Sequence, residues 1–321
     1  MKAKALAKAV LPASLRRALR QLDNRVRRRQ LASVDQLDAE ILRAERAFRV
    51  SEDEGRRALT RFCLAPPRDL PRDPDSGAYR EAQMELYRRI SGRPAYTLEN
   101  EHSTFDVEEA VASPFPYQTR SFCVVADQLL GQAFLLRALG GIPAGANILE
   151  FGPGWGSTTL HLLKLGHRVT AVEIDPKFCE VVRRRGISHA SALTLVHGDM
   201  LAFSSSEKFD AVVFFESFHH CLDHVQLLRN VRTLLRPGGR LVLAAEPVAD
   251  FPYPWGVRLD GESLWAMRRH GWLELGFDTS YFLALLKREG FRYERAFEPA
   301  IGHLSQVITA YPSPRGCLCS S

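Results

Sequence analysis

The chain of 321 residues has no run of 18 apolar residues, so the sequence predicts no membrane-spanning segment. The apolar stretch at residues 3–11 is interrupted by Lys4 and Lys8, which is not typical of a secretory signal. An arginine-rich start that is poor in acids also resembles a mitochondrial presequence, and that alternative stays open. We expect a cytoplasmic protein, with peripheral contact at the inner face of the membrane as a further possibility.

Cysteines are few and scattered, and no two of them form a Cys-x-x-Cys pair. Zinc sites and redox disulfides often use that spacing, so the sequence indicates neither. We expect reduced thiols. The alternative is that the last two cysteines bind a soft metal ion. The cysteines are Cys63, Cys123, Cys179, Cys221, Cys317 and Cys319.

Acidic residues are almost missing from residues 1–30, where ten lysines and arginines face one acid, Asp23. This segment therefore has a net charge of +9, and because the whole chain has +6, the remainder carries −3. A slightly acidic remainder argues against a nucleic-acid cleft, so we expect no nucleic-acid partner. We interpret residues 1–30 as a candidate contact with anionic membrane.

Residues 14–48 carry apolar side chains at helical spacing, with a phase break near Arg29. We interpret them as helices docked on their own domain. A homodimer seam and a membrane-surface helix are the alternatives. The apolar positions are Leu15, Leu19, Leu22, Val26, Val34, Leu37, Ile41, Ala44 and Phe48.

Composition and proline content also indicate the domain boundaries. Residues 65–77 hold four prolines and a glycine, which predicts a linker because proline interrupts helices. The expected parts are a basic helical N-terminal region at 1–64, the linker, a helical lead-in packing on the core at 78–145, a main domain at 146–312 with an insertion at 248–277, and a tail at 313–321.

A glycine turn joins two apolar runs between Ile148 and Glu173. An apolar run, a helical pattern and a β-branched run that ends in an acid together predict a β-turn-α-β unit. Gly152 and Gly154 lie where the first strand passes into the helix, and glycine there permits positive φ and a close backbone approach to a ligand. The Glu173 carboxylate lies about twenty residues on, where it suits ribose hydroxyls.

The glycine spacing distinguishes two kinds of nucleotide site. A dinucleotide fingerprint would need glycine at position 157, which is Ser157. The chain instead reads Glu-x-Gly-x-Gly-x-Gly from Glu150 to Gly156, which resembles motif I of the class I S-adenosylmethionine (SAM)-dependent methyltransferases. Residues 195–200, 209–216 and 234–246 resemble the later motifs of that family, in order.

The resemblance implies an α/β fold, a Rossmann-like doubly wound sheet that is mostly parallel with a last antiparallel strand, and SAM at the carboxyl ends of the strands. Residues 290–297 and 306–311 would form the closing strands. Tyr117 would face the sulfonium, because a π-face attracts a cation, and Arg120 would pair with the methionyl carboxylate. The implied cofactor contacts are Glu150, Gly152, Gly154, Glu173, Ile174, Asp199, Met200 and Tyr117.

A histidine pair follows the predicted fourth strand, directly after Glu216. We favour His220 as a general base, then His219 and then Glu216, because a neutral imidazole can accept a proton near pH 7. A structural or substrate-positioning role is the alternative. A metal role would need a third ligand from the Asp223–His224 turn, and we predict no metal site.

The insertion holds Trp255, Trp265 and Trp272 among polar residues, which suits either a bound sugar or the core of a lid. With a loose similarity to bacterial methyltransferases of polysaccharide pathways, this favours transfer to a hydroxyl of a glycan or small metabolite. The alternatives are C-methyl or cyclopropane-type transfer to a membrane lipid, and a non-catalytic SAM-binding scaffold.

Overall fold

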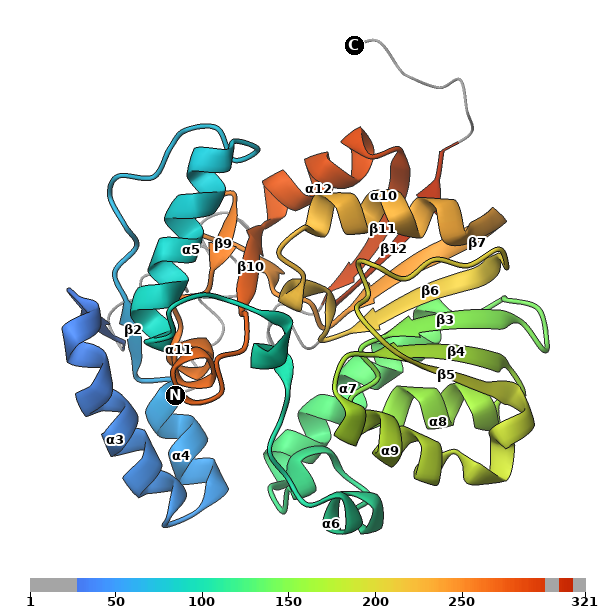
Figure 1. The fold of residues 1–321 in the computed structure, drawn as a ribbon, viewed down its shortest axis with the longest axis horizontal. Coiled ribbons are helices and arrows are strands. Elements are labelled where there is room, and N and C mark those ends of the chain that lie inside the picture. Colours follow the sequence, from blue (N-terminus) through green and yellow to red (C-terminus); the bar gives the residue numbers. More distant parts are fainter. Residues whose placement is uncertain (1–27, 298–305, 314–321) are drawn as a thin grey trace, which may run out of the picture.

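A seven-stranded sheet forms the centre of the computed structural model, which describes residues 28–297 and 306–313 (Figure 1). The strand order is β11-β12-β7-β6-β3-β4-β5. The strands from β7 to β5 are parallel, and β12 runs antiparallel to both β7 and β11, which confirms the predicted fold class. The strands are β3 (Asn147–Phe151), β4 (Arg168–Glu173), β5 (Leu193–His197), β6 (Phe209–Phe215), β7 (Leu235–Ala244), β11 (Phe291–Phe297) and β12 (Gln306–Pro312).

Helices cover both faces of this sheet because successive strand residues point to opposite sides. Ile148 packs in one apolar cluster with Leu135 and Leu163, and Leu149 packs in another with Leu227. Figure 1 shows α10 and α12 on one side of the sheet and α7, α8 and α9 on the other. The helices are α7 (Phe122–Ala138), α8 (Ser157–Lys164), α9 (Pro176–Arg185), α10 (His224–Leu234) and α12 (Thr279–Arg288).

The strand order reverses at β3, which places a crevice at the carboxyl ends of the strands. The chain goes from β3 to β4 on one side and later returns through β6 on the other. The connections that follow β3 and β6 run to opposite sides, which leaves a crevice between the carboxyl ends of these two strands. Ligands of doubly wound folds bind in such a crevice.

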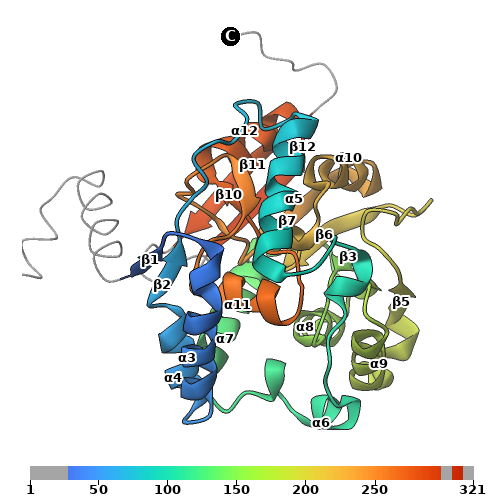
Figure 2. The ribbon, with the colours of Figure 1, turned by 60° about the vertical axis from the view of Figure 1, so that its left-hand side comes forward.

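A second body of structure, here called the side lobe, consists of residues 28–101 and the insertion 248–277. It lies beside the sheet in both views (Figures 1 and 2). Helix α11 packs on α4 and α5, and Arg268 forms an ion pair of 2.7 Å with Asp38. The lobe contains β1 (Arg29–Leu31), α3 (Leu37–Phe48), α4 (Glu52–Leu59), β2 (Phe62–Leu64), α5 (Gly77–Ser91), β8 (Val248–Ala249), β9 (Trp255–Val257), α11 (Gly261–Arg269) and β10 (Leu275–Asp278).

The N-terminal pattern differs from the prediction of helix throughout residues 14–48. Residues 1–27 lie outside the described part of the chain, as do Cys317 and Cys319. Strand β1 replaces helix at 29–31 because it pairs in parallel with β2, and the Leu31 carbonyl accepts a hydrogen bond from the Ala65 amide. Helix α3 begins only at Leu37, and it buries Leu37, Ile41 and Ala44 in its own chain.

Two contacts between the side lobe and the sheet domain come from segments that flank α5. Residues 65–77 lead from β2 to α5 within the lobe, where the Pro74 carbonyl accepts a hydrogen bond of 2.8 Å from Trp255, and Asp75 pairs with Arg288 of α12 in the sheet domain. The segment after α5 passes over the end of β4, where the Ser103 amide donates to Asp175 at 2.6 Å. None of the helices in the described ranges has both the length and the apolar character to cross a bilayer.

Candidate functional site

The glycine turn between β3 and α8 opens onto a cavity of about 420 Å³. Gly152 and Gly154 have φ of 63° and 49°, in the left-handed region that favours glycine. A Cβ on Gly152 would lie 2.7 Å from the Ser217 Cβ, whereas a Cβ on Gly154 would meet nothing within 4 Å. The turn thus packs tightly on one side and leaves the Gly154 backbone free for a ligand on the other.

The Glu173 carboxylate fixes this turn against the end of β4. One oxygen accepts the Gly154 amide at 3.0 Å and the other accepts the Asp175 amide at 3.0 Å. Burial raises the pKa of Glu173 to about 7, and these two amides oppose the rise. The carboxylate lines the cavity, where ribose hydroxyls of a nucleoside can reach it.

The other cofactor residues of the prediction gather around the same cavity, with one exception. Asp199 follows β5, and its carboxylate accepts the Leu201 amide at 2.9 Å. The predicted residues that line the cavity are Gly152, Gly154, Glu173, Ile174, Asp199, Met200 and Tyr117. The exception is Glu150, which is buried under the turn and accepts a hydrogen bond of 2.5 Å from the Thr159 hydroxyl of α8. The structure therefore gives Glu150 a role in holding α8 against β3.

Glu150 provides a test of this placement through the pH dependence of stability. Burial raises the pKa of Glu150 to about 7, above the value near 4.5 of an exposed glutamate. The folded state then binds this proton more tightly than the unfolded state, so stability falls as the pH rises from about 4.5 through 7. Glu150→Gln should raise the thermal unfolding midpoint at pH 8, with a difference that shrinks toward pH 5, as measured by circular dichroism. An unchanged midpoint at pH 8 would contradict the placement.

The segment before α7 covers one side of the cavity in a strained conformation. Tyr117 has φ of 55°, where a non-glycine residue costs ~1–3 kcal/mol, and its ring packs on Trp155 at 5.5 Å. The Thr119 hydroxyl donates to Glu52 of α4 at 2.6 Å, which holds the segment in place. Arg120, predicted to pair with a methionyl carboxylate, is exposed and lies outside the cavity lining.

Glu216 directly follows β6, lines the cavity and is strained in the same way, with φ of 51°. Its carboxylate accepts a hydrogen bond of 2.6 Å from the Gln128 amide of α7. Burial raises the pKa of Glu216 to about 7, which the bond from Gln128 partly opposes. A carboxyl that titrates near neutrality can both accept and release a proton at that pH.

The two histidines point in different directions. His219 is buried outside the cavity lining, and its Nδ1 lies 2.8 Å from Glu246. His220 lines the cavity, with Nδ1 3.0 Å from Glu101. Burial alone would lower the pKa of His220, but the Glu101 carboxylate outweighs it and raises the pKa to about 9. The imidazole thus holds a proton at pH 7, unlike the neutral base that the sequence suggested.

The proposed third ligands of a metal site have other partners. Asp223 forms an ion pair with Arg80 of α5, with a bond of 2.9 Å. His224 is buried, its Nε2 lies 3.3 Å from the Tyr281 hydroxyl, and burial lowers its pKa to about 4. Neither residue completes a site with the histidine pair.

Sequence reasoning missed several cavity residues because they lie outside any motif. They include Glu101 of the side lobe and Gln128 of α7. Of the three tryptophans in the insertion, Trp272 lines the cavity, and its indole nitrogen is buried without a hydrogen-bond partner. Trp255 packs on Tyr79 and Trp265 stacks on Phe48, as expected of a lobe core. Sequence spacing carries no signal that would have found these cavity contacts.

Residues 149–243 match the methyltransferase domain family. A ubiquinone biosynthesis O-methyltransferase of Xanthomonas axonopodis pv. citri (strain 306) is 32% identical over 104 residues, which cover 32% of this chain and 44% of that protein. Ribosomal RNA small subunit methyltransferase A of Leifsonia xyli subsp. xyli (strain CTCB07) is 41% identical over 91 residues, which cover 25% and 32% of the two chains. This chain thus spans less than half the length of these curated relatives.

Among solved structures, the glycopeptide N-methyltransferase MtfA complexed with SAM is 20% identical. The match covers 57% of this chain and 94% of that chain, with a TM-score of 0.46. From the family match and the motifs, residues 149–243 form a methyltransferase domain, and the predicted class I SAM-dependent family is confirmed for this part of the chain.

Proposed function

We propose that this chain, whose residues 149–243 form a methyltransferase domain, transfers a methyl group from SAM to a hydroxyl of a glycan or small metabolite. One observation carries the proposal: the Gly154 amide and the Glu173 carboxylate are joined at the cavity, at the carboxyl end of the sheet. SAM would lie along this turn, with its ribose at Glu173 and its adenine near Ile174, Asp199 and Met200.

Methyl transfer needs the hydroxyl oxygen of the substrate in line with the methyl group of SAM, and a group that accepts the hydroxyl proton. The acceptor oxygen attacks the methyl carbon in line, the carbon–sulfur bond breaks, and sulfur keeps the electron pair to give S-adenosylhomocysteine. Holding the two reactants aligned can supply ~7–11 kcal/mol of the barrier reduction. The hydroxyl proton would pass to the carboxylate of Glu216, which lies in the cavity and is fixed by Gln128.

Two further features support a polar acceptor. Trp272 lines the cavity, and its indole N–H has no hydrogen-bond partner in the protein, so it can donate to an acceptor oxygen. The curated relative named above is an O-methyltransferase by name, in keeping with transfer to oxygen.

The test is incubation of the purified chain with methyl-labelled SAM and a cell extract, followed by fractionation of the label. We expect the label in a glycan or a small hydroxylated metabolite. Label in acyl chains would overturn this acceptor in favour of the lipid alternative. SAM binding without any transfer of label would favour the alternative of a non-catalytic SAM-binding scaffold.

Gly154 allows a matched test of the cofactor position. Gly154→Ala adds a Cβ toward the cavity at positive φ, and Gly141→Ala adds one at φ of 78° with nothing within 4 Å. Both variants should lose ~1–2 kcal/mol of stability, because a left-handed conformation costs an L-residue that much. Only Gly154→Ala should weaken SAM binding about tenfold or more, or ~1.4 kcal/mol, as measured by calorimetry. Equal SAM affinity in the two folded variants would refute the cofactor position.

A further inference from the structure

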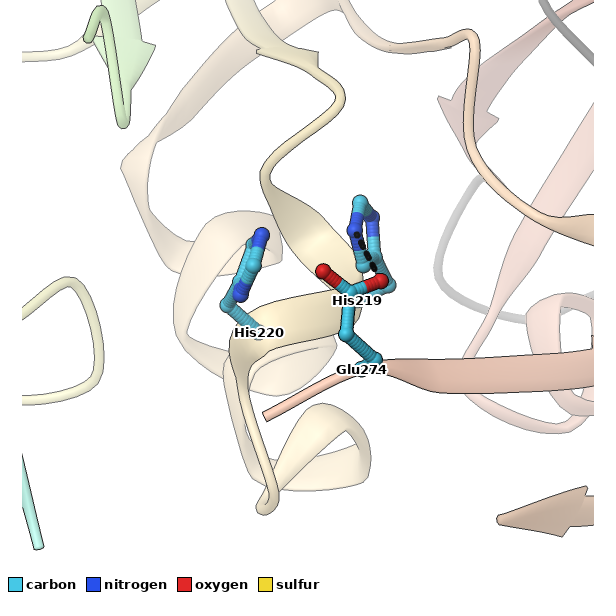
Figure 3. A group of neighbouring side chains, drawn as sticks. All are labelled: His219, His220 and Glu274. Atoms are coloured by element: carbon cyan, nitrogen blue, oxygen red, sulfur yellow. Dashed lines mark ion pairs between the residues drawn. The ribbon is translucent and has the colours of Figure 1, made fainter. Parts of the chain in front are cut away.

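Two adjacent histidines and a glutamate from the insertion meet at the cavity wall (Figure 3). One ligand atom from each of His219, His220 and Glu274 lies within 4.8 Å of the other two. His219 and Glu274 are buried, and His220 is the member that reaches the cavity. Within residues 28–297 and 306–313, no other three side chains of metal-ligand type lie this close together.

The Glu246 carboxylate fixes the orientation of the His219 ring. Its Nδ1 pairs with Glu246 at 2.8 Å, and the same carboxylate accepts the Ser217 and Phe218 amides, each at 2.9 Å. Because Nδ1 lies against Glu246, the Nε2 of His219 is the ring nitrogen left for another partner. Nε2 lies 3.8 Å from Glu274. A carboxylate behind a histidine in this way orients metal-binding imidazoles in many proteins.

The charges around the two imidazoles are unbalanced. Glu101, Glu246 and Glu274 all face the pair, at 3.0, 2.8 and 3.8 Å. Arg258 is the cation beside them, with its Nη1 3.3 Å from one Glu274 oxygen. Arg258 also pairs with Asp260 at 3.0 Å, so carboxylates outnumber the guanidinium here, which favours a further positive partner. Protons on the imidazoles or a bound cation can supply it.

We propose that His219, His220 and Glu274 bind one divalent transition-metal ion at the cavity wall. Two imidazoles and one carboxylate are a ligand set typical of Zn²⁺ and Fe²⁺. Metal bonds of ~2.0–2.2 Å require the three side chains to rotate inward from their present separation. If the proposed methyl transfer is correct, an acceptor hydroxyl bound to the ion beside His220 would have a lowered pKa and lose its proton more readily.

The test is titration of the full-length chain, freed of metal with a chelator, with Co²⁺ and then Zn²⁺. We expect one Co²⁺ per chain with visible d–d absorption from nitrogen and oxygen ligands, and displacement by Zn²⁺. Glu274→Gln should abolish saturable binding or weaken it by at least a hundredfold. Glu246→Gln, which removes the partner behind His219, should weaken binding by ~10–100-fold.

His224→Gln and Glu262→Gln are the matched controls, since they alter a nearby histidine and a carboxylate of the side lobe outside the group. Both should bind Co²⁺ as the wild type does. Absence of saturable binding to the folded wild type would overturn the proposal, as would equal affinity in Glu274→Gln and His224→Gln. A thiolate-to-cobalt charge-transfer band would also overturn it and point to Cys317 and Cys319. Calorimetry with SAM on the metal-free chain tests the proposed function separately.

Discussion

Replacing Glu216 by glutamine is expected to lower methyl transfer by ~10²–10⁴-fold, the usual contribution of a positioned proton acceptor. Glu216 follows β6 in the cavity lining, and its carboxylate is held by Gln128. Glutamine keeps the shape and a hydrogen bond to Gln128 but cannot accept the hydroxyl proton. SAM affinity should stay within a few-fold, because the group acts on the acceptor, so the loss should appear in kcat. Single-turnover transfer and calorimetry on the same sample separate the two quantities.

Asp210→Asn is the matched control for Glu216→Gln. Asp210 lies at the other end of the same strand, where its carboxylate accepts the Asn147 amide at 2.8 Å and pairs with Arg236. This variant should lose some stability and keep its turnover. A Glu216→Gln enzyme with turnover near that of Asp210→Asn would remove Glu216 from the proton-transfer role and leave alignment of the two reactants as the source of the rate.

Replacing Glu173 by alanine is expected to weaken SAM and S-adenosylhomocysteine together by ~10–100-fold. A hydrogen bond to a charged group contributes ~1.5–3 kcal/mol, and the carboxylate is placed to accept from both ribose hydroxyls. It also holds the Gly154 amide at 3.0 Å, so its loss should loosen the turn as well. Turnover at saturating SAM should change much less than affinity, as expected for a group that binds the cofactor.

Glu180→Ala controls for removal of a carboxylate near this part of the sheet. Glu180 lies on α9 and pairs with Arg183 at the surface at 2.6 Å, so its loss should leave SAM affinity unchanged. If Glu173→Ala binds both nucleosides as tightly as Glu180→Ala does, the ribose position is wrong.

The sequence predicts the cofactor side of the cavity because the residues of that side lie close together in the sequence. A strand, a glycine turn and a helix place Gly152 and Gly154, and the end of the next parallel strand places Glu173 at the same edge. Each step follows from spacing within about twenty-five residues. Glu150, predicted as a cofactor contact, lies outside the cavity lining, and its carboxylate meets Thr159 of α8 instead.

The acceptor side could not be predicted in the same way, because it depends on contacts between distant segments. Glu101 and Glu274 reach the histidine pair from two different parts of the side lobe. The two histidines lie on the short turn η5 (Phe218–His220), which has no regular repeat from which the direction of a side chain can be predicted. The sequence therefore does not indicate that His220 lines the cavity and His219 does not. Residues 29–31, predicted as helix, likewise form a strand because they pair with the distant strand β2.

The most direct test of the central claim is calorimetric titration of the wild-type chain with SAM, with S-adenosylhomocysteine and with NAD. The site built from Gly154 and Glu173 should give one saturable SAM site per chain, from which S-adenosylhomocysteine displaces SAM, and no heat with NAD. Saturable NAD binding, or a folded chain that binds neither nucleoside, would contradict the account.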